Sequence, residues 1–591
     1  MNTYSFSLAI RIMKVKLAIL FLSVPGLVLG QEEIVLPVAA VEGHPQEVFA
    51  SPVVLGLKHD RHGLGEVQQG RLLVGELMCR ACHLGADMQK KVGPNLLGVG
   101  RRVDPSFIKE FIVNPMGMDP GTQMPSLLEG LPKAKRDEVA DALTHFLVSL
   151  SAKEFDPGVA KAEEYPVGKN LFHKIGCLSC HGSEQGVNLG HVPLKYGMDS
   201  LTAFLFQPLH TRPSGRMPDM NLTRDEARSI AGYLVGVKRR GGLGLKPVAA
   251  KVVAGKKYFE QFNCASCHEM PGMKAKPSLA FENLRPGKGC LSVQPKGMPR
   301  FHLSTAQRET IGKALKGVGK PFRDKARIQQ AMVAFNCIAC HTRDGAGGVS
   351  DVMFKHFGTN EEGLGNPARI PPTLDGVGVK LKPEWLRKVL FDAETVRPYM
   401  HTRMPQFGEE NLQYLPVLLE NADRLQKVEF PKPNRDARRK YREGGHLLVG
   451  DKGLNCVACH NFNGNPSPGL KGLDLLTSFE RLQPSWFAHF MRNPQKFRPG
   501  IVMPNYWPGG EAVRKDVLKG NPNEQLLALW HYFSLGRSAR DPSGIRAEGT
   551  GLKVTNRTRV YRGRSRVAGY RGIAVGFPDG VNYAFNAENG T

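Results

Sequence analysis

Apolar residues recur at helical spacing in several stretches of the chain. Between positions 139 and 150, and again between 526 and 533, the apolar positions fall three or four residues apart. They are Val139, Ala142, Leu143, Phe146, Leu147 and Leu150 in the first stretch, and Leu526, Leu529, Trp530 and Phe533 in the second. Because this spacing gathers the apolar side chains on one face, we predict amphipathic helices that close on a core.

Two further helices are marked by their starts. Thr223–Glu226 and Ser304–Gln307 have the capping-box pattern, in which a hydroxyl residue is followed three positions later by Glu or Gln. Apolar residues at helical spacing follow each box: Ile230, Tyr233 and Leu234 after the first, and Ile311 and Leu315 after the second. We therefore predict a helix directly after each box.

A short apolar segment that opens with glycine recurs along the chain. The copies are Gly70-Arg71-Leu72-Leu73, Gly168-Lys169-Asn170-Leu171-Phe172, Gly255-Lys256-Lys257-Tyr258-Phe259 and Gly445-His446-Leu447-Leu448, and residues 328–336 hold the corresponding place in a fifth repeat. Each copy leads into a cysteine pair. This repetition indicates internal repeats, each beginning with a short helix.

The last stretch, residues 545–591, has a different pattern. Arginines crowd it, and 573–576 and 581–585 alternate in the manner of strands around the turn Pro578-Asp579-Gly580. Two strands cannot bury a core alone, so this segment is either a truncated domain or one that docks on a neighbour. A disordered basic tail is the alternative, but the aromatic and β-branched content favours strands.

These patterns predict a mostly α protein, a tandem array of small helical domains with a short β-rich C-terminal segment. A chain of 591 residues is long enough for several domains. We place an extended lead-in over 31–65, helical domains over 66–152, 165–238, 250–317, 325–426 and 438–537, and the basic tail over 545–591. Linkers rich in Gly, Pro, Lys or Arg occupy 151–166, 238–250, 316–325 and 427–440.

Residues 1–30 resemble a secretory signal peptide. Arg11, Lys14 and Lys16 precede an apolar run that Pro25 interrupts, and a cut near Gln31 would release the rest. A membrane anchor is the alternative, but the run is short and broken for a span. A start at Met13 would give a more ordinary length. The mature chain is thus expected to be exported, to a periplasm, with at most peripheral membrane association.

The cysteine motif Cys-x-x-Cys-His, the attachment signature of c-type haem, occurs five times. The two cysteines form thioether bonds and the histidine ligates iron. The five motifs are Cys79, Cys82 and His83; Cys177, Cys180 and His181; Cys264, Cys267 and His268; Cys337, Cys340 and His341; and Cys456, Cys459 and His460. Zinc sites and thioredoxin-like pairs also use Cys-x-x-Cys, but neither explains a histidine after every second cysteine. We predict five covalently attached haems.

A second iron ligand is expected for each haem, and Met or His is the usual choice. A Met-Pro pair follows every motif: Met124-Pro125, Met217-Pro218, Met298-Pro299, Met404-Pro405 and Met503-Pro504. Single methionines are often core filler, but one pair per repeat favours ligands. His210, His302 and His401 lie near these pairs and are alternative ligands.

Each repeat resembles a class I cytochrome c domain, over residues 66–537 in all. The segments 93–100 and 372–378 resemble the loop that packs on the proximal side of the haem in that family, and Trp385-Leu386 and Trp486-Phe487, followed by Arg-Pro, resemble the segment before its methionine ligand. The resemblance implies proximal His and distal Met ligands at the ten positions named above. The whole array is similar to large exported multihaem proteins of the Planctomycetes–Verrucomicrobia type.

Composition and charge agree with an exported electron carrier. The formal net charge is +26, and haem propionates and leader removal would lower it without reversing its sign. A basic surface can steer acidic partners, so we expect redox partner proteins, a dehydrogenase or a terminal acceptor, rather than nucleic acid. The alternative is a peroxidase- or dehydrogenase-type enzyme with one open haem. Such a haem would most readily lie in the third repeat. Cys290 stands outside the motifs and is expected to be a buried thiol.

Overall fold

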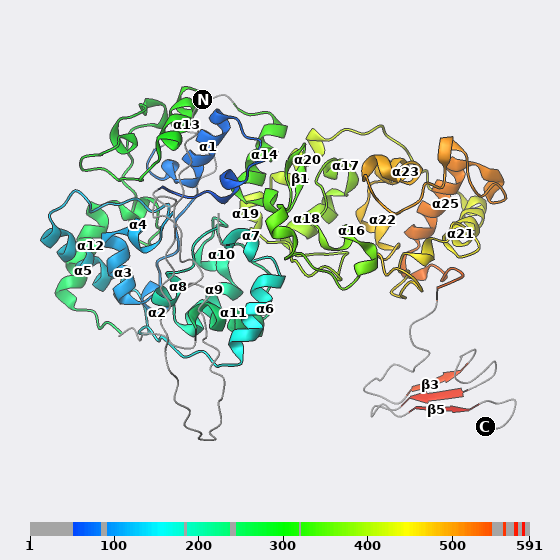
Figure 1. Cartoon of the computed structure of the whole chain (residues 1–591), viewed down its shortest axis with the longest axis horizontal. Helices are drawn as coiled ribbons and strands as arrows, with labels where there is room; N and C mark the ends of the chain where they lie inside the picture. Colours follow the sequence, from blue (N-terminus) through cyan, green and yellow to red (C-terminus); the bar gives the residue numbers. More distant parts are fainter. Residues whose placement is uncertain are drawn as a thin grey trace, which may run out of the picture.

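The computed structural model of the chain is mostly helical (Figure 1), as predicted. It describes residues 51–83, 91–182, 186–236, 244–317, 321–545 and three strands beyond them. The predicted signal over 1–30 and the first part of the lead-in lie outside the described residues. No helix within the described residues has the length and apolar character of a membrane span.

The helices are numbered in their order along the chain. Up to the second motif they are α1 (Glu66–Glu76), α2 (Val99–Arg102), α3 (Pro105–Val113), α4 (Pro115–Met118), α5 (Lys133–Ser149), α6 (Glu164–Lys174) and α7 (Leu178–His181). Up to the fourth they are α8 (Val192–Lys195), α9 (Met198–Phe206), α10 (Pro208–Thr211), α11 (Arg224–Val235), α12 (Ala249–Gln261), α13 (Thr305–Lys316) and α14 (Asp324–Ala334). The remainder are α15 (Asp351–Phe354), α16 (Asn366–Arg369), α17 (Val377–Lys380), α18 (Pro383–Phe391), α19 (Glu409–Leu412), α20 (Leu415–Ala422), α21 (Arg435–Val449), α22 (Thr477–Arg481), α23 (Pro484–Arg492), α24 (Pro494–Phe497) and α25 (Pro522–Ser534).

The helices predicted from apolar spacing and from capping boxes are confirmed. Helices α5 and α25 cover the two periodic stretches. Both boxes are formed, because the hydroxyls of Thr223 and Ser304 accept from the backbone N–H three residues on, and the Glu226 and Gln307 side chains accept from the backbone N–H groups of Thr223 and Ser304 in return. The apolar faces that follow belong to the buried core.

A long helix before each motif packs on a helix that follows a Met-Pro pair. In three cases the partners belong to the same repeat: α6 with α11, α14 with α20, and α21 with α25. In the other two cases the partners are exchanged. Helix α1 packs on α13, and α12 packs on α5. The sequence predicts that 66–152 and 250–317 are two separate domains. In the structure, each of these stretches contributes one helix to each of the two exchanged pairs.

The opening glycines of the repeats lie where the paired helices cross. A Cβ on Gly70 would stand 1.9 Å from the backbone oxygen of Thr310 in α13, and one on Gly255 would stand 2.1 Å from that of Ala142 in α5. Gly168 meets Ser229 in α11 in the same way. Glycine is required at each of these positions because the two backbones touch.

Side-chain contacts support both exchanged pairs. Phe146 of α5 and Phe259 of α12 pack edge to face with their ring centroids 5.6 Å apart, and Lys251 Nζ lies 2.6 Å from Asp141 Oδ2. Between α1 and α13, Lys313 Nζ lies 2.5 Å from Glu66 Oε1.

The described helices therefore form five groups, which we name after the motif histidine that each contains. The His83 group is α1 with residues 277–317, and the His268 group is α12 and its motif with residues 91–149. The other three are consecutive: the His181 group (164–235), the His341 group (324–422) and the His460 group (435–534).

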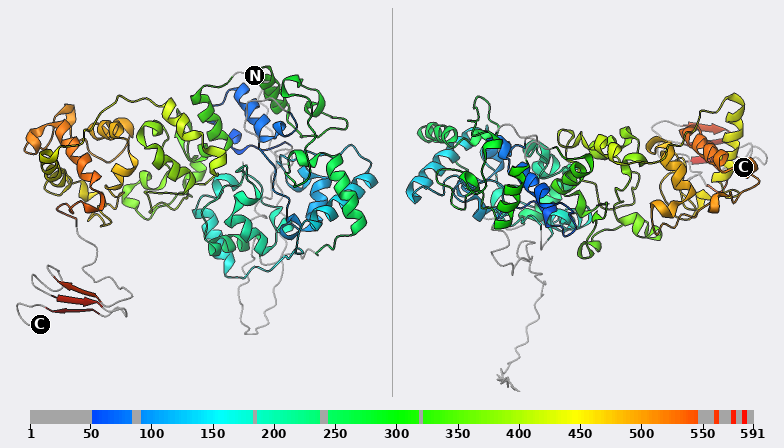
Figure 2. Two further views of the ribbon diagram at one scale, coloured as in Figure 1. Left: turned by 180° about the vertical axis from the view of Figure 1, so that it is seen from behind. Right: turned by 90° about the horizontal axis from the view of Figure 1, so that it is seen from above.

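Four of the groups close into a ring, and the His460 group extends from it (Figure 1). Short antiparallel bridges join neighbours: Ser126 with Arg300, Val103 with Tyr196, and Asp219 with Gln406. The ring closes where α1 meets α14, and Gln330 Nε2 donates to Gln68 O at 3.1 Å. Viewed from behind, the molecule narrows from this ring toward the His460 group (Figure 2).

The described part of the lead-in is packed rather than merely extended. Residues Leu55–Lys58 form a 3-10 turn against α14, where a Cβ on Gly56 would stand 2.0 Å from Val333 O. His59 Nε2 bonds Gly348 O at 3.0 Å. This segment therefore ties the His83 group to the His341 group.

The tail contains the strands that the alternation predicts. Strands β4 (Ile573–Gly576) and β5 (Asn582–Phe585) pair antiparallel, with Ala574 opposite Ala584. The predicted turn between them lies outside the described residues. A third strand, β3 (Arg559–Arg562), pairs with β4 and was not predicted, because its arginines mask the alternation. A two-residue hairpin, β1 (Thr342–Arg343) and β2 (Ala346–Gly347), follows the fourth motif.

The helix crossings generate a test with an internal control. We expect Gly70→Ala to destabilise the protein by about 1–3 kcal/mol, because the methyl group would overlap the backbone of α13. Gly75, in the same helix, has nothing within 4 Å of a Cβ, so Gly75→Ala should be neutral or stabilising. Thermal unfolding of the two purified variants followed by circular dichroism measures the difference. Equal midpoints would contradict this packing.

Candidate functional site

The five Cys-x-x-Cys-His motifs share one backbone turn. In each, the histidine N–H donates to the carbonyl of the first cysteine, at 2.9 to 3.0 Å. The residue before the first cysteine is left-handed in four motifs, at Met78, Asn263, Asn336 and Asn455, and Gly176 holds that place in the second with φ 115°. One tight turn thus presents both cysteines and the histidine together at the end of a helix.

All five motif histidines bond a backbone carbonyl through Nδ1. The acceptors are Leu279 O for His83 (2.8 Å), Val187 O for His181 (3.2 Å), Pro94 O for His268 (2.9 Å), Pro372 O for His341 (2.7 Å) and Leu473 O for His460 (3.1 Å). Because a carbonyl only accepts, Nδ1 carries the proton and Nε2 has its lone pair available. This is the arrangement of a metal-ligating histidine whose ring is oriented by its other nitrogen.

Burial favours the neutral form of four of these five rings. Desolvation lowers the pKa of His268, His341 and His460, and that of His181 as well. A backbone carbonyl opposes the shift in each case, as the bonds above require. The neutral imidazole is the form that binds a metal.

Two of these bonds cross between repeats. Pro94 lies in the loop predicted to pack beside the first motif, but its carbonyl accepts from His268 of the third. In return, His83 bonds Leu279, and Ser278 N–H donates to Cys82 O at 2.9 Å. The segment 372–378, by contrast, contacts the motif of its own repeat, because Pro372 O accepts from His341 Nδ1.

A cavity of about 570 Å³ lies beside His268. Cys264 and His268 line it on one side, and residues of the 91–149 segment, including Met124 and Leu127, line it on another. Residues between 195 and 212 of the second repeat complete the lining. No described residue of 66–83 contributes to it. Its lining is largely apolar, with aromatic rings from Phe107 and Phe111. This cavity has the size and character of a cofactor site.

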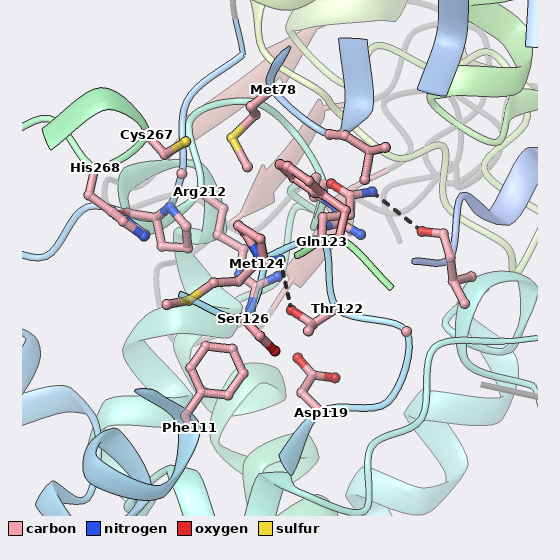
Figure 3. Close-up of a pocket in the computed structure, with 18 of the residues that line it drawn as sticks. Met78, Phe111, Asp119, Thr122, Gln123, Met124, Ser126, Arg212, Cys267 and His268 are labelled. Carbon is pink, nitrogen blue, oxygen red and sulfur yellow. Dashed lines mark hydrogen bonds between the residues drawn. The ribbon is translucent and has the colours of Figure 1, made fainter. Parts of the chain in front are cut away.

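A larger cavity of about 910 Å³ opens onto the first three motifs together. Met124, Met217 and Met298 all contribute to its lining. In the close-up, Met124, Cys267 and His268 lie at the same end of the pocket, while Thr122 Oγ1 accepts from the Met124 N–H (Figure 3). The structure therefore brings Met124 to the third motif, whereas the order along the chain pairs it with the first.

The Met-Pro segments pair with each other across groups. Residues directly after two of the pairs, Ser126 and Arg300, exchange backbone hydrogen bonds of 2.9 and 3.0 Å. Asp219 and Gln406, two residues after Met217 and Met404, do the same at 2.8 Å. Met503 is half-buried against the core of the His460 group. Each Met-Pro pair is thus held at a group boundary or against a core.

Two of the three alternative histidine ligands are engaged elsewhere. His302 Nε2 lies 2.8 Å from Ser126 Oγ, and His401 Nε2 lies 2.7 Å from Asn360 Oδ1. His210 lines the cavity beside His268. Cys290 is partly rather than fully buried, and it lines the larger cavity with Cys79 and Cys82.

Neighbouring motifs approach one another in pairs. Cys82 Sγ lies 3.4 Å from Ser266 Oγ, which joins the first and third motifs. Cys340 Sγ lies 3.7 Å from Ser179 Oγ, and Asn336 Nδ2 donates to Ser179 O at 3.3 Å, which joins the second and fourth. Groups attached at these cysteines would be near neighbours.

Four cations, one buried and three half-buried, gather between the His341 and His460 groups. Lys380 and Arg397 come from one group, and Arg481 and Arg498 from the other. Burial and the three arginines lower the pKa of Lys380 to about 7. Within the described residues, Arg397 Nη1 and Arg481 Nε are buried without a hydrogen-bond partner. Buried cations without counter-charges are costly, so this cluster fits an anionic group.

The residues present fit a covalently attached haem. Each motif supplies paired thiols and an oriented imidazole, the apolar cavities suit a porphyrin face, and the cation cluster suits propionates. Elsewhere in the part of the chain that is described, no three His, Cys, Asp or Glu side chains gather to hold a bare metal ion.

Sequence reasoning missed two features of the site. One is the stretch Pro277-Ser278-Leu279, whose Pro-x-Leu pattern matches the Pro94-Asn95-Leu96 loop and signals a proximal segment for a histidine. The other is the cation cluster, for which no local signal exists, because Lys380 and Arg498 are far apart in the chain.

Comparisons of the chain with protein-family models, with curated proteins and with solved structures find no match. The site is therefore described by its own geometry alone.

The left-handed residue before each motif can be tested at Asn455, whose φ is 56°. We expect Asn455→Val to cost about 1–2 kcal/mol, because a β-branched residue is strained in that conformation. Asn455→Gly should be tolerated, since glycine holds this place at position 176. Denaturant unfolding of both variants measures the difference. If the valine variant unfolds at the same concentration as the glycine variant, the motif turn is not as described.

Proposed function

We propose that this chain is an exported pentahaem c-type cytochrome that carries electrons between redox partners. In this proposal the five motifs attach five haems through ten cysteines, and the helical groups are five cytochrome c domains of class I type. The observation that carries the proposal is the common set of five histidines, each with Nδ1 bonded to a carbonyl and Nε2 available.

The chain's residues would hold each haem and set its reduction potential. The histidines present Nε2 to one face of the iron, and the Met-Pro segments present a thioether to the other. The neutral thioether favours ferrous iron and so raises the potential relative to two histidines. Bound haem iron supplies one-electron chemistry, and the protein supplies ligands, dielectric and position.

The group contacts suggest a route for electrons. The first and third motifs touch, as do the second and fourth, and the cation cluster joins the His341 and His460 groups. Following neighbours, the order is His83, His268, His181, His341 and His460, which differs from the order along the chain. We propose that the His460 group, which extends from the ring, exchanges electrons with an outside partner.

The basic charge of the chain favours an acidic redox partner, a dehydrogenase or a terminal acceptor, in an exported compartment such as the periplasm. A multihaem oxidoreductase with one open haem is the alternative. An open haem lacks a second protein ligand and binds small ligands. The binding of a small ligand to the purified protein therefore distinguishes the two functions.

A reductive titration tests the proposed function. The purified, exported protein should take up five electrons per chain and show the bands of low-spin c-type haem throughout. Carbon monoxide added to the reduced protein should leave the spectrum unchanged, because both iron faces are occupied. A high-spin fraction that binds carbon monoxide would favour the oxidoreductase, and an absence of haem would overturn both functions.

The cation cluster generates a second prediction. Arg481→Gln should lower the reduction potential of the haems in the His341 and His460 groups, because a nearby buried cation favours the less positive ferrous state. The expected shift is on the order of 1 kcal/mol per electron for a charge at an effective dielectric constant near 20. Arg435→Gln removes an exposed charge at the start of α21 and is the control. Equal potentials in both variants would contradict the role of the cluster.

A further inference from the structure

We propose that the first and third motifs exchange their methionine ligands. The haem attached at Cys79 and Cys82 takes His83 and Met298, and the haem attached at Cys264 and Cys267 takes His268 and Met124. The inference rests on the proposed function, since it concerns how two of the five haems are ligated. It departs from the assignment by chain order, in which each motif uses the next Met-Pro pair.

The first support comes from the helix crossings. A motif turn is the direct continuation of the helix before it, so the helix partner decides which segment faces the motif. Helix α1 crosses α13 at Gly70, and α12 crosses α5 at Gly255, in each case with backbone against backbone. The first motif therefore lies on the segment that carries Met298, and the third on the segment that carries Met124.

The second support comes from the proximal side. Pro94 O accepts from His268, and Gly93 N–H donates to Cys267 O at 2.7 Å. A Cβ on Gly93 would stand 2.9 Å from the His268 ring, so this loop is in direct contact with the third motif. The reciprocal contacts join Ser278 and Leu279 to the first motif.

The third support comes from the cavities. The cavity of about 570 Å³ beside His268 has Met124 in its lining, and no residue of the first motif. The first motif instead lines the larger cavity, to which the segment after Leu279 contributes Cys290, Gly297 and Met298. The second and third motifs, Met124 and Met217 line that larger cavity as well. A Cβ on Gly289, next to Cys290, would stand 3.4 Å from the Met298 sulfur. The smaller cavity thus places the third motif with Met124 and with no other methionine of a Met-Pro pair.

The exchange makes one interlocked body of two haem sites. Residues 66–152 contain the first motif together with Met124, which in this proposal belongs to the third. Residues 250–317 contain the third motif together with Met298, which belongs to the first. Neither stretch can complete a site alone. The paired bridge between Ser126 and Arg300, directly after the two methionines, couples the distal sides of both sites.

Removing one attachment site at a time distinguishes exchanged from unexchanged ligation. In a chain with Cys79→Ala and Cys82→Ala, four haems remain. If ligands are exchanged, adding Met124→Ala opens one haem to carbon monoxide, while adding Met298→Ala opens none. The reverse result, or the same result for both methionines, would overturn the exchange. Loss of all haem would instead overturn the proposed function.

A chain with Cys264→Ala and Cys267→Ala gives the mirror experiment. Here Met298→Ala should open one haem and Met124→Ala none. The count of haems that bind carbon monoxide per chain, one against zero, is the readout in both series. Met217→Ala is the matched control, because it should open one haem in either background if the second site is ligated within its own repeat.

A measurement on the unaltered holoprotein covers the case in which these variants fail to fold. A carbodiimide joins a carboxylate to an amine with loss of water and no spacer. It should link Glu66 to Lys313 and Asp141 to Lys251, because those pairs lie 2.5 and 2.6 Å apart. Mass spectrometry of the digested protein identifies the links. Links from α1 to α5 and from α12 to α13 would show the unexchanged arrangement and overturn the inference.

Discussion

The backbone crossing of paired helices is the contact on which the rest of the structure depends. At Gly70, Gly168, Gly255 and Gly445 one helix lies directly against the backbone of another, and a methyl group would overlap it. Each crossing sets the direction of a helix that ends in a motif turn. The turn then directs two thiols and an imidazole from the end of the helix, so the same steric constraint positions the chemistry in four of the five repeats.

The same constraint explains how two repeats can exchange partners. The helices α1 and α12 share a glycine followed by large apolar residues, at Leu72 and Leu73 in one and Tyr258 and Phe259 in the other. Either helix satisfies the local requirement of a crossing. Which partner is chosen depends on contacts far apart in the chain, such as Lys313 with Glu66 and Phe146 with Phe259.

Features set by neighbouring residues can be predicted from the sequence, whereas features set by contacts far apart in the chain cannot. The helix over 139–150, the capping boxes at Thr223 and Ser304, and strands β4 and β5 follow from spacing within a few residues, and the structure has them. The motifs and the Met-Pro pairs are equally local signals. The partnership of Met124 with His268 is not, since chain order favours His83 and only packing decides against it. The cation cluster around Lys380 was missed for the same reason, whereas strand β3 was missed because its arginines mask the alternation.

The account rests on haem at all five motifs, and the intact mass of the exported chain tests this most directly. Measured under denaturing conditions, the mass should exceed that of the processed polypeptide by five haems, because thioether bonds survive denaturation. A Cys456→Ala, Cys459→Ala variant should carry four. A chain that carries no covalent haem, or whose mass is unaffected by loss of these two cysteines beyond the substitutions themselves, would contradict the account.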